Sequence, residues 1–226
     1  MAHIPAERCL DIIELLADGA REMPLRDVAE RLDLPKSGVH RMLATLVDLG
    51  WAAQDPGTGF YRLTMHLAVL GQKFYAATGV ADVCQPLLDR LAGASHEFVR
   101  LAVHDGHALV WIAHAQGALG RGLVYQPPDT SGSVPLHATA SGKAWLASLT
   151  PEAAVQHVLR EGGFERADRF GPRVVRTVDA LLADLALTRT RGYGLAVEEA
   201  EPGVTAIGVA IRGALPGAGA GTVSVA

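Results

Sequence analysis

The fold is decided by the stretch Leu25-Arg26-Asp27-Val28-Ala29-Glu30-Arg31-Leu32-Asp33-Leu34-Pro35-Lys36-Ser37-Gly38-Val39-His40-Arg41-Met42-Leu43. Val28, Ala29 and Leu32 recur at helical spacing and predict a short helix over 25–32, with Pro24 at its start. Residues 33–35 predict a turn. A second helix follows up to Gly50, and Ser37 is positioned to cap it. Two short helices joined by a tight turn are typical of a helix-turn-helix.

An amphipathic stretch before this pair and a hairpin after it complete the first domain. Leu10, Ile13 and Leu16 predict a helix over 6–18. Residues 51–54 and 60–63 have extended patterning on either side of the Gly/Pro-rich segment 55–59, so they predict a two-stranded wing. We therefore predict a winged helix-turn-helix over residues 1–63.

The second helix of the pair carries polar residues that suit DNA. Helical geometry places Ser37, His40 and Arg41 on one outward face, opposite the apolar positions. Lys36 and Ser37 lie near the helix N-terminus, where free N–H groups favour phosphate. The candidate DNA-binding residues are Lys36, Ser37, His40, Arg41, Tyr61 and Arg62. The plainer alternative is a helical hairpin with a solvated polar face, which the adjacent wing disfavours.

The patterning becomes mixed after residue 63. Residues 64–79 predict a helical connector. Strands are predicted at 98–103, 108–113, 123–125, 194–197, 205–212 and 222–225, and helices at 80–91, 137–149, 151–160 and 178–189. We expect an α+β fold, in which a second domain over 80–226 has a mainly antiparallel sheet flanked by helices.

The overall composition does not indicate a nucleic-acid partner. The chain has 226 residues, of which 49% are hydrophobic, and a formal net charge of -4. This length is sufficient for two buried cores. Within the first 75 residues, eight Lys and Arg stand against ten Asp and Glu. Any charge that binds DNA must therefore be local.

Several functions receive no support from the residues. Cys9 and Cys84 belong to no set with metal-ligand spacing, so we expect no metal and no cofactor. We find no signal-peptide pattern and no apolar run of membrane-spanning length, so we expect a cytosolic protein without a membrane partner. Residues 137–144 lack both the first glycine and the final Ser or Thr of a phosphate-binding loop. No catalytic set can be assembled from spacing, and we do not expect an enzyme.

The recognition segment resembles that of a known family. The run Leu34-Pro35-Lys36-Ser37-Gly38-Val39-His40-Arg41-Met42-Leu43-Ala44-Thr45-Leu46 resembles the recognition helix of IclR-type regulators, which commonly read LPKSTVHRLLATL. Gly38 replaces the usual Thr, which removes a hydroxyl and lowers helix propensity. The resemblance continues through Val134-Pro135-Leu136-His137-Ala138-Thr139-Ala140-Ser141-Gly142-Lys143-Ala144-Trp145-Leu146-Ala147 and Arg191-Gly192-Tyr193-Gly194, and so spans nearly the whole chain.

The resemblance implies a transcription regulator that binds a double-stranded DNA operator as a homodimer, with tetramers known among relatives. Its second domain would be GAF-like, would contribute to oligomerisation and would hold a small organic acid effector. The pocket-wall positions that the resemblance implies are Leu123, Tyr125, Val134, Ala140, Ser141, Ala206 and Ser224. Relatives often carry Asp where this chain has residues 196–197, and the loss of that group favours an aromatic or weakly polar carboxylic acid over a simple 2-oxo acid.

Other residues leave alternatives open. Arg100 is a second candidate anchor for a carboxylate, with a structural ion pair as the more frequent role of such an Arg. For Trp111 and Trp145 we expect core or dimer packing rather than ligand contact. The acidic run 198–201 is expected to be a solvated loop. Two rival functions are a small-molecule-binding enzyme and a ligand-binding module whose winged helix contacts protein, and both predict no salt-sensitive DNA binding.

Overall fold

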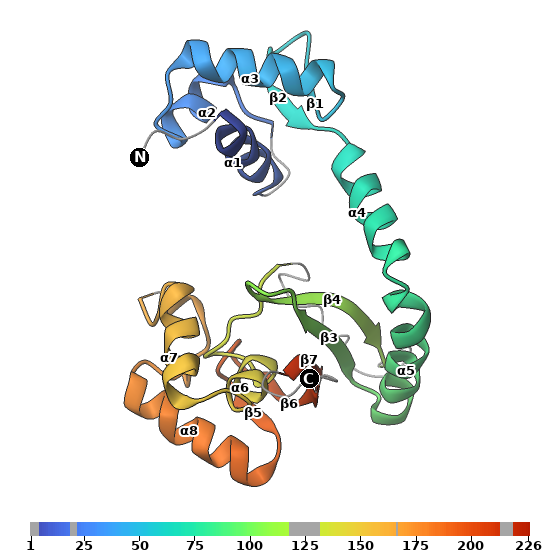
Figure 1. The fold of residues 1–226 in the computed structure, drawn as a ribbon, viewed down its shortest axis with the longest axis vertical. Helices are drawn as coiled ribbons and strands as arrows, with labels where there is room; N and C mark the ends of the chain where they lie inside the picture. The colour runs from blue at the N-terminus through green and yellow to red at the C-terminus, as the bar shows by residue number, and fades with distance from the viewer. Residues whose placement is uncertain (1–4, 19–21, 118–131, 166, 213–218) are drawn as a thin grey trace. The chain divides into compact units, whose positions relative to one another are not determined.

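The chain folds as two units, Met1–Gly79 and Val80–Ala226 (Figure 1). The structure is a computed structural model that describes residues 5–18, 22–117, 132–165, 167–212 and 219–226. The strand predicted at 123–125 lies outside the described residues. Each unit has its own hydrophobic core. Within the described ranges, no helix is both long enough and apolar enough to cross a membrane.

The N-terminal unit is a winged helix-turn-helix, as predicted. Its elements are α1 (Pro5–Ala17), α2 (Leu25–Arg31), α3 (Lys36–Asp48), β1 (Ala52–Gln54), β2 (Tyr61–Leu63) and α4 (His66–Ala77). Strands β1 and β2 pair in antiparallel fashion and form the wing. Ile12, Val28 and Leu43 are fully buried, so α1, α2 and α3 share one core.

The start of α3 differs from the prediction that Ser37 caps it. The helix begins two residues earlier than such a cap would place it, at Lys36, and Pro35 occupies the N-cap position without a side-chain hydrogen bond. The Pro35 carbonyl oxygen accepts hydrogen bonds from the N–H groups of Gly38 and Val39, at 2.9 and 3.1 Å. Because the proline ring fixes φ near the value that precedes a helix, this residue starts α3 without a capping hydroxyl.

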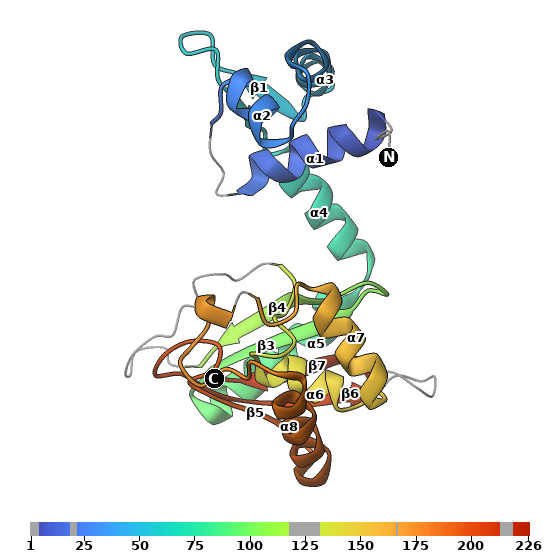
Figure 2. The same cartoon turned by 90° about the vertical axis from the view of Figure 1, so that its left-hand side faces the viewer.

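The C-terminal unit is a five-stranded antiparallel sheet with helices on both faces (Figures 1 and 2). The strand order is β4-β3-β7-β6-β5, which confirms the predicted α+β class. In chain order the elements are α5 (Val80–Ser95), β3 (Phe98–His104), β4 (Leu109–Gln116), α6 (Ala140–Leu146), α7 (Pro151–Arg160), the short 3-10 helix Ala167–Arg169, α8 (Val178–Arg191), β5 (Gly194–Val197), β6 (Thr205–Arg212) and β7 (Gly219–Val225).

The two faces of the sheet have different covers. On one face, Leu88 of α5 packs with Val99 and Leu101 of β3. Ala102 points to the other face, where it shares a core with Trp145 of α6 and side chains from α7 and α8. This alternation along β3 follows from the two-residue period of a strand. The start of α6 lies directly over this second face, beside β5 and β6.

Two glycines allow this close approach of α6. A Cβ atom on Gly194 would lie 2.2 Å from the Ala140 carbonyl oxygen, and one on Gly208 would lie 2.9 Å from the Ser141 backbone nitrogen. Any side chain at either position would push α6 away from β5 and β6. The N-terminus of α6 is therefore held against the sheet at a fixed depth.

Candidate DNA-binding helix and effector pocket

The outward face of α3 carries the residues that the sequence predicted for DNA. Lys36, Ser37, His40 and Arg41 are all exposed, while Val39 on the opposite side is fully buried. Gly38 lies among them, and a Cβ atom there would meet nothing within 4 Å. The glycine is therefore not required by packing. The arrangement presents two formal cations and two polar side chains from one short helical surface.

The wing places its two candidate residues on opposite sides. Arg62 is exposed, and its Nε lies 3.3 Å from Glu22 Oε1. Tyr61 is only 3% exposed and packs in the core of the unit, so its prediction as a DNA-binding residue is wrong. The reason is strand alternation: since Arg62 faces outward, both of its neighbours face inward.

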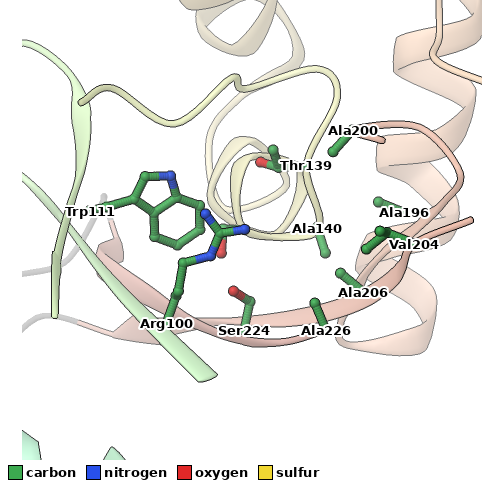
Figure 3. A pocket seen from close by; sticks show the side chains of 11 residues that line it. Arg100, Trp111, Thr139, Ala140, Ala196, Ala200, Val204, Ala206, Ser224 and Ala226 are labelled. Atoms are coloured by element: carbon green, nitrogen blue, oxygen red, sulfur yellow. The ribbon is translucent and has the colours of Figure 1, made fainter. Parts of the chain in front are cut away.

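A small hollow, open to solvent, lies between the sheet and the start of α6 (Figure 3). Its lining residues are Arg100, Trp111, Thr139, Ala140, Ser141, Ala196, Ala200, Val204, Ala206, Ser224 and Ala226. Five predicted effector residues, Arg100, Ala140, Ser141, Ala206 and Ser224, are thus brought together from four elements. They are near one another although 124 positions separate the first from the last in the chain.

Three predicted wall residues are not placed in this hollow. Val134 is fully buried in the core beside α6, so the prediction that it lines the pocket is wrong for this hollow. Its N–H donates to the Leu109 carbonyl at 2.7 Å, which holds it along the sheet edge rather than over the pocket. Leu123 and Tyr125 lie outside the described residues.

The hollow has a polar end and an apolar end. At one end the Arg100 guanidinium carbon lies 4.3 Å from the centre of the Trp111 ring (Figure 3). Such stacking stabilises a cation over an aromatic face. Ser224 lies beside this pair, while the far end is walled by alanines and a valine: Ala196, Ala200, Val204, Ala206 and Ala226. None of the described lining residues is acidic.

Trp111 packs against the core, in line with the prediction from the sequence, and it also lines the hollow. Arg100 pairs with His114 across β3 and β4, and a β-bulge between Leu101 and Ala102 then brings Trp111 opposite Ala102. Without the bulge, residue 112 would occupy that position. Trp111 therefore shares the face of Arg100, and a regular alternation pattern gives no sign of it.

The start of α6 adds hydroxyl groups to the hollow. Thr139 is the N-cap, and its Oγ1 accepts a hydrogen bond from the Gly142 N–H at 3.0 Å. Ser141 is fully buried, and its Oγ has no hydrogen-bond partner among the described residues. A buried hydroxyl without a partner is uncommon in folded proteins, so this group suits a bound polar ligand.

An exposed recognition helix and wing occur together with a domain that carries a small hollow, polar at one end and apolar at the other. These features define the class of DNA-binding transcription regulators that respond to small molecules. The sequence matches the IclR helix-turn-helix domain over residues 5–56. It matches the bacterial transcriptional regulator IclR C-terminal domain over residues 72–226. The chain therefore belongs to the IclR family, whose members are transcription regulators and not enzymes.

Individual relatives agree along most of the chain. The HTH-type transcriptional regulator BhcR of Paracoccus denitrificans is 33% identical over 205 residues, which are 91% of this chain and 71% of the relative. XynR of Escherichia coli is 32% identical over 91% of this chain and 79% of the relative. The crystal structure of an IclR homolog from Microbacterium hydrocarbonoxydans, complexed with 4-hydroxybenzoate, has a TM-score of 0.76 at 26% identity, covering 98% of this chain and 88% of that one.

Proposed function

We propose that this IclR-family regulator binds an operator as a homodimer. Its affinity for the operator changes when a small aromatic or weakly polar carboxylic acid enters the hollow. The observation that carries the proposal is the stacked Arg100 at the polar end of a pocket that is otherwise walled by small apolar side chains. The genes that it controls would be catabolic genes for such acids.

Operator contacts would come from the exposed face of α3. Arg41 has the length and the donor geometry to pair with guanine or to hold a phosphate. Lys36 and Ser37, at the N-terminus of α3, suit phosphate because free N–H groups point there. His40 lies between Ser37 and Arg41 in the sequence and faces the same way. Arg62 would reach the neighbouring DNA backbone from the wing.

The effector would lie with its carboxylate toward Arg100. A guanidinium binds a carboxylate through two parallel N–H donors. Ser141 Oγ and Ser224 would add hydrogen bonds, and an apolar ring would fill the alanine-walled end. A relative that was crystallised with 4-hydroxybenzoate supports an aromatic acid. Ala196, at the position where relatives often carry Asp, leaves the wall without a negative charge that would repel an anion.

A dimer is supported by α4, none of whose residues is buried. Met65 at its start and Phe74 within it are 74% and 73% exposed. Large apolar side chains that are exposed together usually mark an interaction site. A tetramer would require a second apolar surface, and β6 exposes Ile207, Val209 and Ile211.

A thermal-shift screen of acids tests the effector proposal. At a ligand concentration of 100 Kd, binding adds about 2.7 kcal/mol to stability, which raises the melting midpoint by roughly 5–10 °C. We expect benzoate-type acids to do so, pyruvate to have little effect, and Arg100→Met to remove the response. Arg90→Met, which removes an exposed cation from α5, is the control. A response only to neutral compounds, or an unchanged response in Arg100→Met, would contradict the proposal.

A further inference from the structure

The C-terminal unit buries a lysine completely. Lys143 of α6 has no exposed side-chain surface, and its Nζ contacts the carboxylates of Asp184 and Glu199. It also donates a hydrogen bond to the Leu195 carbonyl oxygen at 3.3 Å. Burying an ammonium group costs several kcal/mol unless charged partners compensate it. The three acceptors provide that compensation.

Arg191 extends this cluster and balances its charge. Its Nη2 lies 3.3 Å from Asp184 Oδ1, and its Nε donates to the Tyr193 carbonyl at 2.7 Å. Two cations and two carboxylates thus meet with no net charge. The side chains of Asp184 and Glu199 are only 20% and 12% exposed. The prediction that the acidic run 198–201 is a solvated loop is therefore wrong for Glu199.

The cluster joins segments that also build the effector hollow. Lys143 lies one helical turn after Ala140 and Ser141, which line the hollow. Glu199 lies in the segment 198–204 between β5 and β6, which contributes Ala200 and Val204 to the opposite wall. The third partner, Asp184, belongs to α8. One buried ammonium therefore connects both walls of the pocket to a helix outside it.

The segment 198–204 has its own local structure, and the N–H groups of Gly171 and Arg173 donate to its Glu199 and Glu198 carbonyl oxygens at 2.8 and 3.2 Å. The Glu198 N–H donates to the Val204 carbonyl at 2.8 Å, and the Gly203 N–H donates to Glu198 Oε1 at 3.1 Å. These bonds close a turn without attaching it to α6. The Glu199 carboxylate makes that attachment. Burial raises the pKa of the Glu199 carboxyl and Lys143 lowers it, so this contact offsets a cost of burying the group.

We propose that Lys143 and Glu199 are positioning residues, which hold the wall segment 198–204 against α6 and thereby set the affinity of the pocket for its effector. The proposal rests on the proposed function for the identity of the ligand, but not for the position of the segment. An apolar pair of similar size in place of the ion pair often leaves stability unchanged or higher. We therefore expect the ion pair to contribute less to the stability of the fold than to the position of the segment 198–204 against α6.

The experiment compares hydrogen exchange in wild type, Glu199→Gln and the double variant Lys143→Met/Glu199→Met. The double variant keeps the net charge and the Asp184–Arg191 contact. We expect it to melt within a few degrees of wild type, while peptides that cover 198–204 exchange at least tenfold faster. Peptides from α7 should be unchanged in all variants, and Glu152→Gln, which removes an exposed carboxylate from α7, should behave as wild type throughout.

A second arm uses benzoate, or whichever acid gives the largest shift in the thermal screen. The Kd of the protein for this acid should rise at least tenfold in Glu199→Gln and in Lys143→Met/Glu199→Met. Unchanged protection of 198–204 in a folded double variant would overturn the proposal, and if that variant does not fold, unchanged protection in Glu199→Gln would do the same. Because exchange is measured without ligand, a screen in which no acid binds would contradict the proposed function and leave this test intact.

Discussion

Arg41 holds its guanidinium on the exposed side of α3, where no packing role competes with DNA contact. We expect Arg41→Ala to weaken operator binding by roughly 10–100-fold, because a good base or phosphate contact contributes about 1–3 kcal/mol. Effector binding should be unchanged, because the pocket belongs to the other unit. Fluorescence anisotropy with labelled operator measures the first effect and the thermal-shift assay the second. Equal operator affinity in Arg41→Ala and the α5 control Arg90→Ala would exclude Arg41 from the DNA-binding face of α3.

Glu161 predicts a pH dependence of stability. The residue is exposed but lines a hollow with His137 and Phe170, and desolvation of the carboxyl there raises its pKa from 4.5 to about 7, against the opposing effect of the Leu136 N–H. The folded protein therefore binds this proton more tightly than the unfolded chain does. The stabilisation is full below pH 4.5 and is lost as the pH rises through 7.

Urea denaturation at pH 5, 6, 7 and 8 measures this loss. The free energy of unfolding should fall across the range in wild type, and Glu161→Gln should flatten the fall because glutamine does not titrate. Glu165→Gln, four residues away and also exposed, serves as the control. If Glu161→Gln keeps the wild-type slope, the desolvation of this carboxyl is not the cause.

Two glycines with opposite surroundings predict opposite effects of substitution on stability. Gly194→Ala would place a Cβ 2.2 Å from the Ala140 carbonyl, so α6 must shift and stability should fall by at least about 2 kcal/mol. Gly38→Ala meets open space within α3 and should stabilise the N-terminal unit by about 1 kcal/mol through helix propensity. Chemical denaturation followed by circular dichroism compares both. An unchanged free energy of unfolding in Gly194→Ala would show that α6 is not packed closely against β5.

Sequence periodicity was sufficient for most elements and for the exposed face of α3. It located α2 and α3 because their apolar residues recur at helical spacing, and it located β6 from its extended run. It missed contacts that depend on distant pairing or local irregularity. The bulge at residue 101 that brings Trp111 to the pocket has no sequence signature, and the Lys143–Glu199 contact joins positions 56 residues apart. Tyr61 was misassigned because a three-residue strand offers too little alternation to tell its faces apart.

DNA binding by this chain has to overcome an unfavourable net charge. The chain has a formal net charge of -4. Binding must therefore depend on the few cations of α3 and the wing. A two-fold symmetric dimer doubles these contacts and requires an operator with matching half-sites. Each phosphate that the dimer neutralises makes affinity more sensitive to salt, with a slope of about -0.9 per contact.

We propose that this chain is an effector-responsive, operator-binding regulator. The most direct test titrates the full chain against the DNA flanking its own gene, by anisotropy, at salt concentrations from 50 to 300 mM. We predict saturable binding of one dimer per operator, affinity that falls steeply with salt, and a change in affinity when a stabilising acid is added. A folded dimer that shows no preference for this DNA over a scrambled fragment at any salt concentration would contradict the claim.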